Sequence, residues 1–141
     1  MIVKNFKKFL IEISFAIILG IGFSFFYSKF LNLSFCFFNR SLFFWFVLLV
    51  NAIWEEVAFR GIIWELLENK VKGNIYFVSK LNVVVALLFA LAHIIIGKAT
   101  FYRLLTFFPG LVFGYFRENY DTLIIPISLH ILYNLFVFCW C

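Results

Sequence analysis

Two adjacent carboxylates and an arginine, Glu55, Glu56 and Arg60, stand in the middle of a long apolar segment that begins near Ser41 and contains no proline before Glu68. Each charge near the centre of a membrane helix costs about 2.5 to 3.5 kcal/mol, so the three together cost roughly 8 to 10 kcal/mol. The nine Leu, Ile, Val and Phe residues that precede them in this segment offset only about 3 to 5 kcal/mol on the same scale. The segment therefore cannot be an ordinary lipid-facing anchor, and we expect its charged side chains to face the interior of the protein.

The composition of the whole chain places it in a membrane. Hydrophobic residues make up 65% of its 141 residues and charged residues only 13%, whereas about a quarter of the residues in a soluble domain are charged. The 12 Lys and Arg residues exceed the 7 Asp and Glu residues, but they stand singly or in short clusters between apolar runs. That distribution is typical of membrane flanks and not of a nucleic-acid-binding surface. We predict a membrane protein in contact with lipid and no nucleic-acid partner.

The apolar runs predict an all-α fold, a polytopic transmembrane helical bundle of about five spans. The spans are expected at residues 9–27, 41–68, 81–97, 104–116 and 123–141, with a Phe-rich connector at 31–40 and polar turns at 69–80 and 117–122. The second run is long enough to outreach the hydrocarbon core of a bilayer. Gly110 and Gly114, four residues apart in the fourth run, should allow another helix to approach closely.

The basic residues favour one orientation in the membrane. With the N-terminus inside, seven Lys and Arg residues flank the spans on the cytoplasmic side and four flank them on the other side. We therefore predict a multi-pass protein of the plasma (cytoplasmic) membrane with a cytoplasmic N-terminus. No internal repeat divides the chain, so we expect one membrane-embedded domain over residues 1–141, with a motif core at about 41–134 and an N-terminal span and connector at 1–40.

Helical geometry gives the two carboxylates different surroundings. Residues four apart share a face of a helix, so Glu56 lies on the face of Arg60, and Glu55 on the face of Asn51. The Glu56–Arg60 pair largely neutralises itself. Burial next to a second carboxylate favours Glu55 as a general base, with Asn51 as a supporting residue. The same charges could instead form a buried network that only fixes helix packing.

Further polar residues stand in other spans. His93 lies in the third span, and His130 and Asn134 are four residues apart on one face of the last span. A lone membrane histidine is usually a hydrogen-bonded packing residue, but two histidines and a facing asparagine, added to a Glu pair, favour function. We expect them to converge with Glu55 in a polar catalytic cavity inside the membrane.

These residues belong to three motifs, EExxxR at residues 55–60, FxxxH at 89–93 and HxxxN at 130–134. In this order the motifs resemble those of the CPBP family, which comprises the type II CAAX-processing endopeptidases and their bacterial relatives linked to bacteriocin processing and immunity, also called Abi proteins. The resemblance covers roughly residues 41–134. It implies an intramembrane endopeptidase with a glutamic mechanism and no covalent nucleophile.

The resemblance also implies a role for each polar residue. Glu55 would activate a water molecule together with His93, while His130 and Asn134 would form the oxyanion site. The ion pair of the first motif would hold the architecture. No cofactor is implied, and the substrate would be a membrane-associated peptide or protein, such as a prenylated protein or a bacteriocin precursor.

Two other classes of function stay open at the level of the sequence. A zinc hydrolase would use His93, His130 and a glutamate, although these ligands come from separate helices and lack the compact HExxH arrangement. A non-enzymatic membrane protein, for bacteriocin self-immunity, peptide binding or proton-coupled transport, would use the buried Glu and His groups without hydrolysis.

Overall fold

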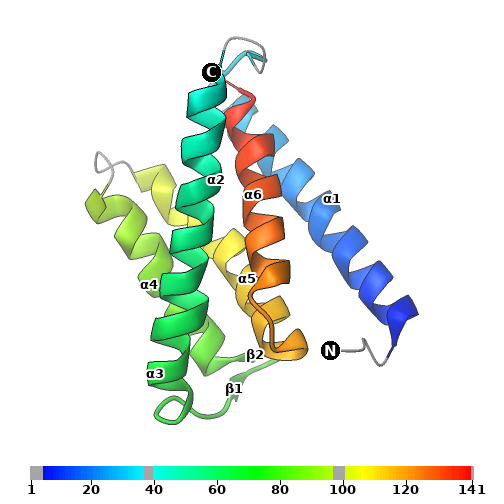
Figure 1. The fold of residues 1–141 in the computed structure, drawn as a ribbon, viewed down its shortest axis with the longest axis vertical. Coiled ribbons are helices and arrows are strands. Elements are labelled where there is room, and N and C mark those ends of the chain that lie inside the picture. Colours follow the sequence, from blue (N-terminus) through cyan, green and yellow to red (C-terminus); the bar gives the residue numbers. More distant parts are fainter. Residues whose placement is uncertain (1–4, 37–39, 97–100, 141) are drawn as a thin grey trace. The chain divides into compact units, whose positions relative to one another are not determined.

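The computed structural model describes residues 5–36, 40–96 and 101–140, and most of these residues lie in helices (Figure 1). The elements in chain order are α1 (Phe6–Phe30), α2 (Leu42–Glu56), η2 (Val57–Ile63), α3 (Trp64–Glu68), β1 (Asn74–Ile75), β2 (Val78–Ser79), α4 (Lys80–Ile96), η3 (Phe101–Thr106), α5 (Phe107–Tyr120) and α6 (Ile124–Phe138). The all-α prediction is correct apart from the short hairpin of β1 and β2.

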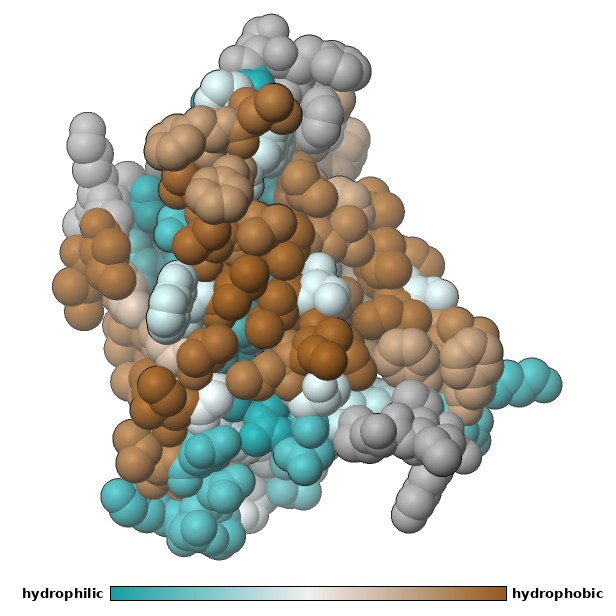
Figure 2. Space-filling view, viewed as in Figure 1, coloured by the Kyte–Doolittle hydropathy of each residue, from teal (hydrophilic) through white to brown (hydrophobic). Residues whose placement is uncertain are grey.

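Two helical stretches in the described parts of the chain are long and apolar enough to cross a membrane. They are α1 and the continuous helix Leu42–Glu68, which consists of α2, η2 and α3. Helices α4 and α6 are apolar but shorter. Figure 2 shows hydrophobic side chains along the visible helices and hydrophilic side chains gathered around the loop after α3. The full set of about five spans stays a prediction.

The long helix begins and ends where its sequence predicts. The hydroxyl of Ser41 accepts a hydrogen bond from the Phe44 N–H at 3.2 Å, which caps the first turn. The helix then runs to Glu68. Its middle differs from the expectation of regular α-helix, because η2 is a π-helix in which the backbone turn is widened.

Two predicted polar turns contain more regular structure than expected. The fourth span, predicted at 104–116, begins in the 3-10 helix η3 and continues as α5. Helix α5 then runs to Tyr120, through most of the polar turn predicted at 117–122. It stops where Asp121 adopts a left-handed conformation with φ of 46°. The loop predicted at 69–80 folds into the antiparallel hairpin of β1 and β2. The hydroxyl of Ser79 then caps α4 by accepting from the Asn82 N–H at 3.0 Å.

The chain divides into two compact units, and each is described here by itself. Unit 1 comprises Met1–Ile53 and Ser128–Cys141, and unit 2 comprises Trp54–Ile127. The single domain predicted from the sequence stays a prediction. Helices α2 and α6 each contribute residues to both units.

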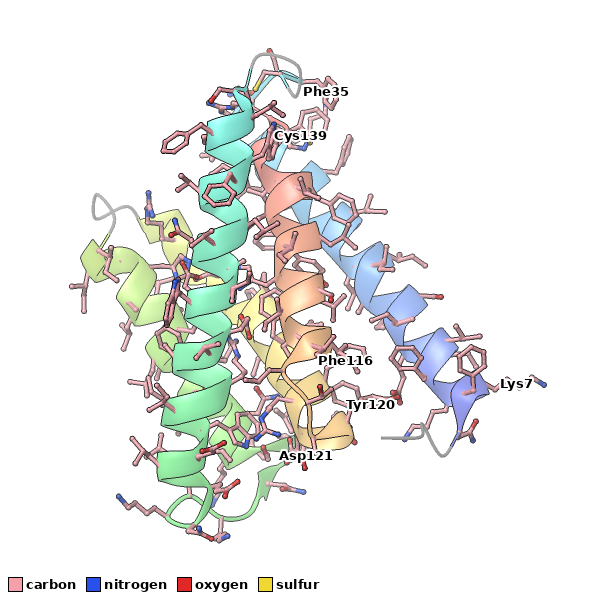
Figure 3. The ribbon with its side chains drawn as sticks, in the orientation of Figure 1. Lys7, Phe35, Phe116, Tyr120, Asp121 and Cys139 are labelled. Atoms are coloured by element: carbon pink, nitrogen blue, oxygen red, sulfur yellow. The ribbon has the colours of Figure 1, made fainter. Side chains whose placement is uncertain are left out.

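In unit 1, α1 packs against α6 through a stripe of small residues. The buried residues of α1 are spaced by four: Ala16, Gly20, Ser24 and Ser28. The Tyr133 hydroxyl donates to the Ala16 carbonyl at 2.6 Å, and Gly20 leaves room for the Tyr133 ring. Trp140 Nε1 donates to the Ser24 hydroxyl at 2.8 Å. Beyond the helices, the Cys36 N–H donates to the Cys139 carbonyl at 2.7 Å, near the labelled Phe35 and Cys139 of Figure 3.

In unit 2, α4 packs closely against α5, as the spacing of the two glycines predicts. Gly110 lies against Ala86, and Gly114 lies against the side chain of Asn82. A Cβ atom at Gly114 would lie 1.9 Å from Asn82 Oδ1, so a larger residue here would force the Asn82 side chain to move. Asn82 Nδ2 donates to the Leu111 carbonyl at 3.0 Å, which joins the two helices by a polar contact.

Candidate active site

Glu55 and His93 lie next to each other in unit 2. Glu55 is in the last turn of α2 and His93 is in the last turn of α4. Their nearest atoms, Glu55 Oε2 and His93 Nε2, are 3.6 Å apart. The side chains are 34% and 24% exposed, respectively. Two residues of separate motifs therefore meet at a partly exposed position.

The orientation of the His93 ring identifies the nitrogen that faces Glu55. His93 Nδ1 lies 2.9 Å from the carbonyl oxygen of Phe89. A carbonyl can only accept, so Nδ1 carries a hydrogen and donates it. In the neutral imidazole, Nε2 then carries the lone pair that faces Glu55. Two acceptors at this separation can both receive a hydrogen bond from one water molecule, whose oxygen lone pairs stay available for attack.

Glu56 and Arg60 form the ion pair that their spacing predicts. Arg60 Nη1 lies 3.0 Å from Glu56 Oε1, and both side chains are fully buried. Arg60 Nη2 also donates to the Gly110 carbonyl of α5 at 2.8 Å. The guanidinium lies over the rings of Phe89 and Phe113, at 4.5 and 5.4 Å from their centroids. A buried charge with these partners stabilises the packing of three elements.

Phe89 connects the ion pair to the candidate catalytic histidine. Its ring lies under the Arg60 guanidinium on one side and packs against the His93 ring with centroids 4.5 Å apart. Its carbonyl accepts from His93 Nδ1. The first residue of FxxxH therefore orients the last one, which explains in physical terms why an aromatic residue precedes the histidine by one turn.

His130 and Asn134 lie in unit 1, on α6. His130 is buried. Asn134 lines a cavity of about 20 Å³, which is large enough for about one water molecule. The other residues that line this cavity are Trp45, Leu48, Leu49, Ile131 and Leu135. Asn51, predicted as a supporting residue, is exposed on α2. The convergence of His130 and Asn134 with Glu55 and His93 stays a prediction.

Arg117 contacts this region, although the sequence suggested only a flanking position at the membrane surface. Arg117 Nε donates to the backbone carbonyl of Arg60 at 2.9 Å. Its other nitrogens face two carboxylates: Nη1 pairs with Asp121, labelled in Figure 3, and Nη2 lies 4.0 Å from Glu65. The i,i+4 spacing of Arg117 and Asp121 could have predicted their ion pair. No pattern near Arg117 in the sequence predicts its contact with Arg60.

Within the described ranges, no three His, Cys, Asp or Glu side chains are grouped as a metal site would require. The zinc ligands considered from the sequence are divided between the units, with His130 in unit 1 and His93 in unit 2. Metal analysis of the purified protein is the test of zinc binding.

Comparison with known families gave one match that bears on this site. A family model described as Rce1-like, type II CAAX prenyl endopeptidase Rce1-like, matches residues 37–136. The matched region is more than half of the chain and contains all three motifs. Comparison with curated proteins and comparison with solved structures gave no match.

Proposed function

Because the chain belongs to the Rce1-like family of type II CAAX prenyl endopeptidases, we propose that it is an intramembrane endopeptidase that hydrolyses a peptide bond by means of a water molecule activated by Glu55. The family is one of membrane-embedded proteases that act on peptide or protein substrates. The observation that carries the proposed mechanism is the 3.6 Å separation of Glu55 Oε2 and His93 Nε2.

In this mechanism Glu55 and His93 hold one water molecule between them. Glu55 takes a proton from the water, and the oxygen attacks the carbonyl carbon of the substrate. The C–N bond of the tetrahedral intermediate then breaks, and the proton passes to the leaving nitrogen. The hydrogen bond from His93 Nδ1 to Phe89 supports this assignment, because it leaves Nε2 as the nitrogen that contacts the water.

His130 and Asn134 would supply the oxyanion site. They share one face of α6, and a cavity the size of a water molecule lies beside Asn134. An amide N–H and an imidazole N–H are suitable donors to the developing negative charge, because they stabilise it most strongly where water is excluded. The Glu56–Arg60 pair is fully buried, which favours a supporting role over contact with the substrate.

The substrate would be a membrane-associated or lipidated peptide or protein, for which a prenylated C-terminus and a bacteriocin precursor are the two candidates. No cofactor takes part in this mechanism. We place the protein in the plasma (cytoplasmic) membrane with its N-terminus in the cytoplasm, because the basic residues favour that orientation. Self-immunity without proteolysis and a zinc-dependent reaction are the alternatives that the experiments below distinguish.

The test of this function is cleavage by the purified protein in lipid vesicles. Fluorescence-quenched peptides with and without a prenyl group at the C-terminus are incubated with the parent, with Glu55→Gln, and with Glu68→Gln. Glu68 is an exposed carboxylate at the end of α3, so it is a matched control. We expect Glu55→Gln to abolish cleavage and Glu68→Gln to retain it. Equal cleavage by Glu55→Gln and the parent would end the glutamic mechanism.

A further inference from the structure

The π-helix η2 changes the hydrogen bonding of the long helix just after the two carboxylates. In an α-helix the N–H of Trp64 would donate to the carbonyl of Arg60, four residues earlier. In the structure it donates to the carbonyls of Phe59 and Gly61 instead. The widened turn therefore removes from the Arg60 carbonyl the donor that a regular helix supplies.

Arg117 supplies a donor in place of the one that the widened turn removes. Its Nε donates to the Arg60 carbonyl at 2.9 Å, across from α5. The side chain is only 12% exposed, and its outer nitrogens face Glu65 and Asp121. The carboxylates hold the guanidinium from the solvent side while Nε faces the helix. One arginine thus donates to a backbone carbonyl of a turn in another element.

Arg60 lies within this turn, and its backbone and side chain both contact α5. Helix α5 holds Arg60 twice, because Arg117 binds its carbonyl and the Gly110 carbonyl accepts from its Nη2. The Arg60 guanidinium lies on Phe89, whose ring and carbonyl both contact His93. Return of η2 to α-helical geometry would rotate the side chains after the turn relative to the carboxylates before it. Arg60, Phe89 and His93 would then move relative to Glu55.

We propose that Arg117 is a positioning residue: by donating Nε–H to the Arg60 carbonyl it stabilises the π-helical turn and thereby sets the separation of Glu55 and His93. This inference rests on the proposed function for its effect on catalysis. Its structural part, that Arg117 stabilises η2, is independent of that function. A π-helical turn is uncommon and departs from the preferred hydrogen bonding of the α-helix, so an additional donor from another helix should favour it.

Two substitutions separate the donor of Arg117 from its charge. Arg117→Gln places an amide N–H at the position of Nε and removes the positive charge, whereas Arg117→Met keeps the length of the stem and removes both. The neighbouring exposed carboxylate Glu118 provides a control, Glu118→Gln. The intact protein is purified in lipid, and kcat, KM and the pH dependence of kcat are measured. Hydrogen exchange of residues 57–64 is measured on the same samples.

We expect Arg117→Met to lower kcat about tenfold and to raise hydrogen exchange in residues 57–64 by a similar factor, since one hydrogen bond of ordinary strength is lost. KM should stay within about twofold of the parent. The pH dependence of kcat should shift in Arg117→Met, because the Glu55–His93 separation changes. Arg117→Gln should restore kcat, exchange and pH dependence to within about threefold of the parent, because its amide N–H keeps most of a neutral hydrogen bond.

Equal impairment of Arg117→Gln and Arg117→Met would overturn the inference, because the charge and not the donor would then matter. Parental kcat and exchange in Arg117→Met would overturn it as well, and so would a loss of folded protein with an unchanged pH dependence. If the parent itself does not cleave, or Glu55→Gln still cleaves, the proposed function fails, and hydrogen exchange alone decides whether Arg117 stabilises η2.

Discussion

The Arg60 side chain contacts several elements of unit 2. It is fully buried and contacts a carboxylate, a backbone carbonyl and two aromatic rings. These partners lie in its own helix, in α4 and in α5. Loss of the guanidinium would leave the Glu56 carboxylate buried without its countercharge, and burial of such a charge is strongly unfavourable.

We therefore expect Arg60→Ala to lower the stability and abundance of the protein by much more than Glu55→Gln. Breaking a buried ion pair costs about 3 to 5 kcal/mol, whereas replacing a partly exposed carboxylate by its isosteric amide changes little. Abundance in the membrane fraction and the melting temperature in detergent measure the difference. Arg60→Ala with the parental melting temperature would show that the pair does not support the fold.

The oxyanion role of Asn134 gives a second prediction at the scale of a residue. Removal of one oxyanion donor lowers turnover about 100- to 1,000-fold, so Asn134→Ala should reduce kcat by that factor with nearly unchanged abundance. Asn119→Ala, on the exposed surface of α5, is the control. Cleavage by Asn134→Ala at the parental rate would contradict the assignment, and would be expected if a bound zinc ion stabilised the oxyanion.

At the scale of an element, α1 stabilises the helix that carries the HxxxN motif. It lies largely outside the matched residues 37–136, yet it packs within unit 1 against Tyr133, which stands between His130 and Asn134 in the sequence. The small-residue stripe of α1 makes this approach possible, since any larger side chain at its centre would displace the Tyr133 ring.

Two neighbouring glycines of α1 test this packing. A Cβ atom at Gly20 would lie 2.4 Å from the Tyr133 ring, whereas a Cβ atom at Gly22 would meet nothing within 4 Å. We expect Gly20→Ala to destabilise the protein by about 1 to 3 kcal/mol through overpacking, and Gly22→Ala to be neutral or slightly stabilising. Thermal unfolding in detergent measures both. Equal melting temperatures for the two variants would mean that α1 does not pack on α6 in the membrane.

At the scale of the whole molecule, the predicted catalytic residues are divided between the two units. Glu55 and His93 belong to unit 2, and His130 and Asn134 to unit 1. The family match spans residues of both units, so the proposed reaction requires both. The orientation of the chain in the membrane and the metal dependence of the proposed reaction are predictions that concern both units.

The charge distribution predicts that the loop from residue 69 to residue 80 faces the cytoplasm. Lys72 is exposed in this loop, so a cysteine there, with the native cysteines replaced, should resist a membrane-impermeant maleimide in intact cells and react after permeabilisation. Asn119 is exposed in the last turn of α5, and a cysteine introduced there serves as a second reporter for the same side. Labelling of Lys72→Cys in intact cells would contradict the predicted topology.

The glutamic mechanism predicts activity without bound metal. Cleavage should persist after extended chelation, and the purified protein should contain no stoichiometric zinc, because Glu55 and not a metal ion removes the proton from water. Metal analysis together with activity after chelation measures this. Activity that is lost on chelation and restored by added zinc would favour the zinc-dependent mechanism over the glutamic mechanism.

The sequence by itself determined those features that depend on contacts close in the chain and on transfer of apolar groups into lipid. The bounds of the long helix, the Ser41 cap and the Glu56–Arg60 pair follow from hydrogen bonds and spacings within one or two helical turns. The family could be recognised from the sequence because each of its motifs is short and lies within two turns of one helix.

Only the tertiary structure decided the widened turn of η2 and the approach of Glu55 to His93. Arg60 in this turn has partners in Arg117 and Gly110, which are distant in the sequence and belong to another helix. The Glu55–His93 approach depends on Phe89, whose place is fixed by the packing of α4. Such contacts leave no local pattern, because a backbone carbonyl or a ring face accepts a distant arginine without any change in the spacing of residues around it.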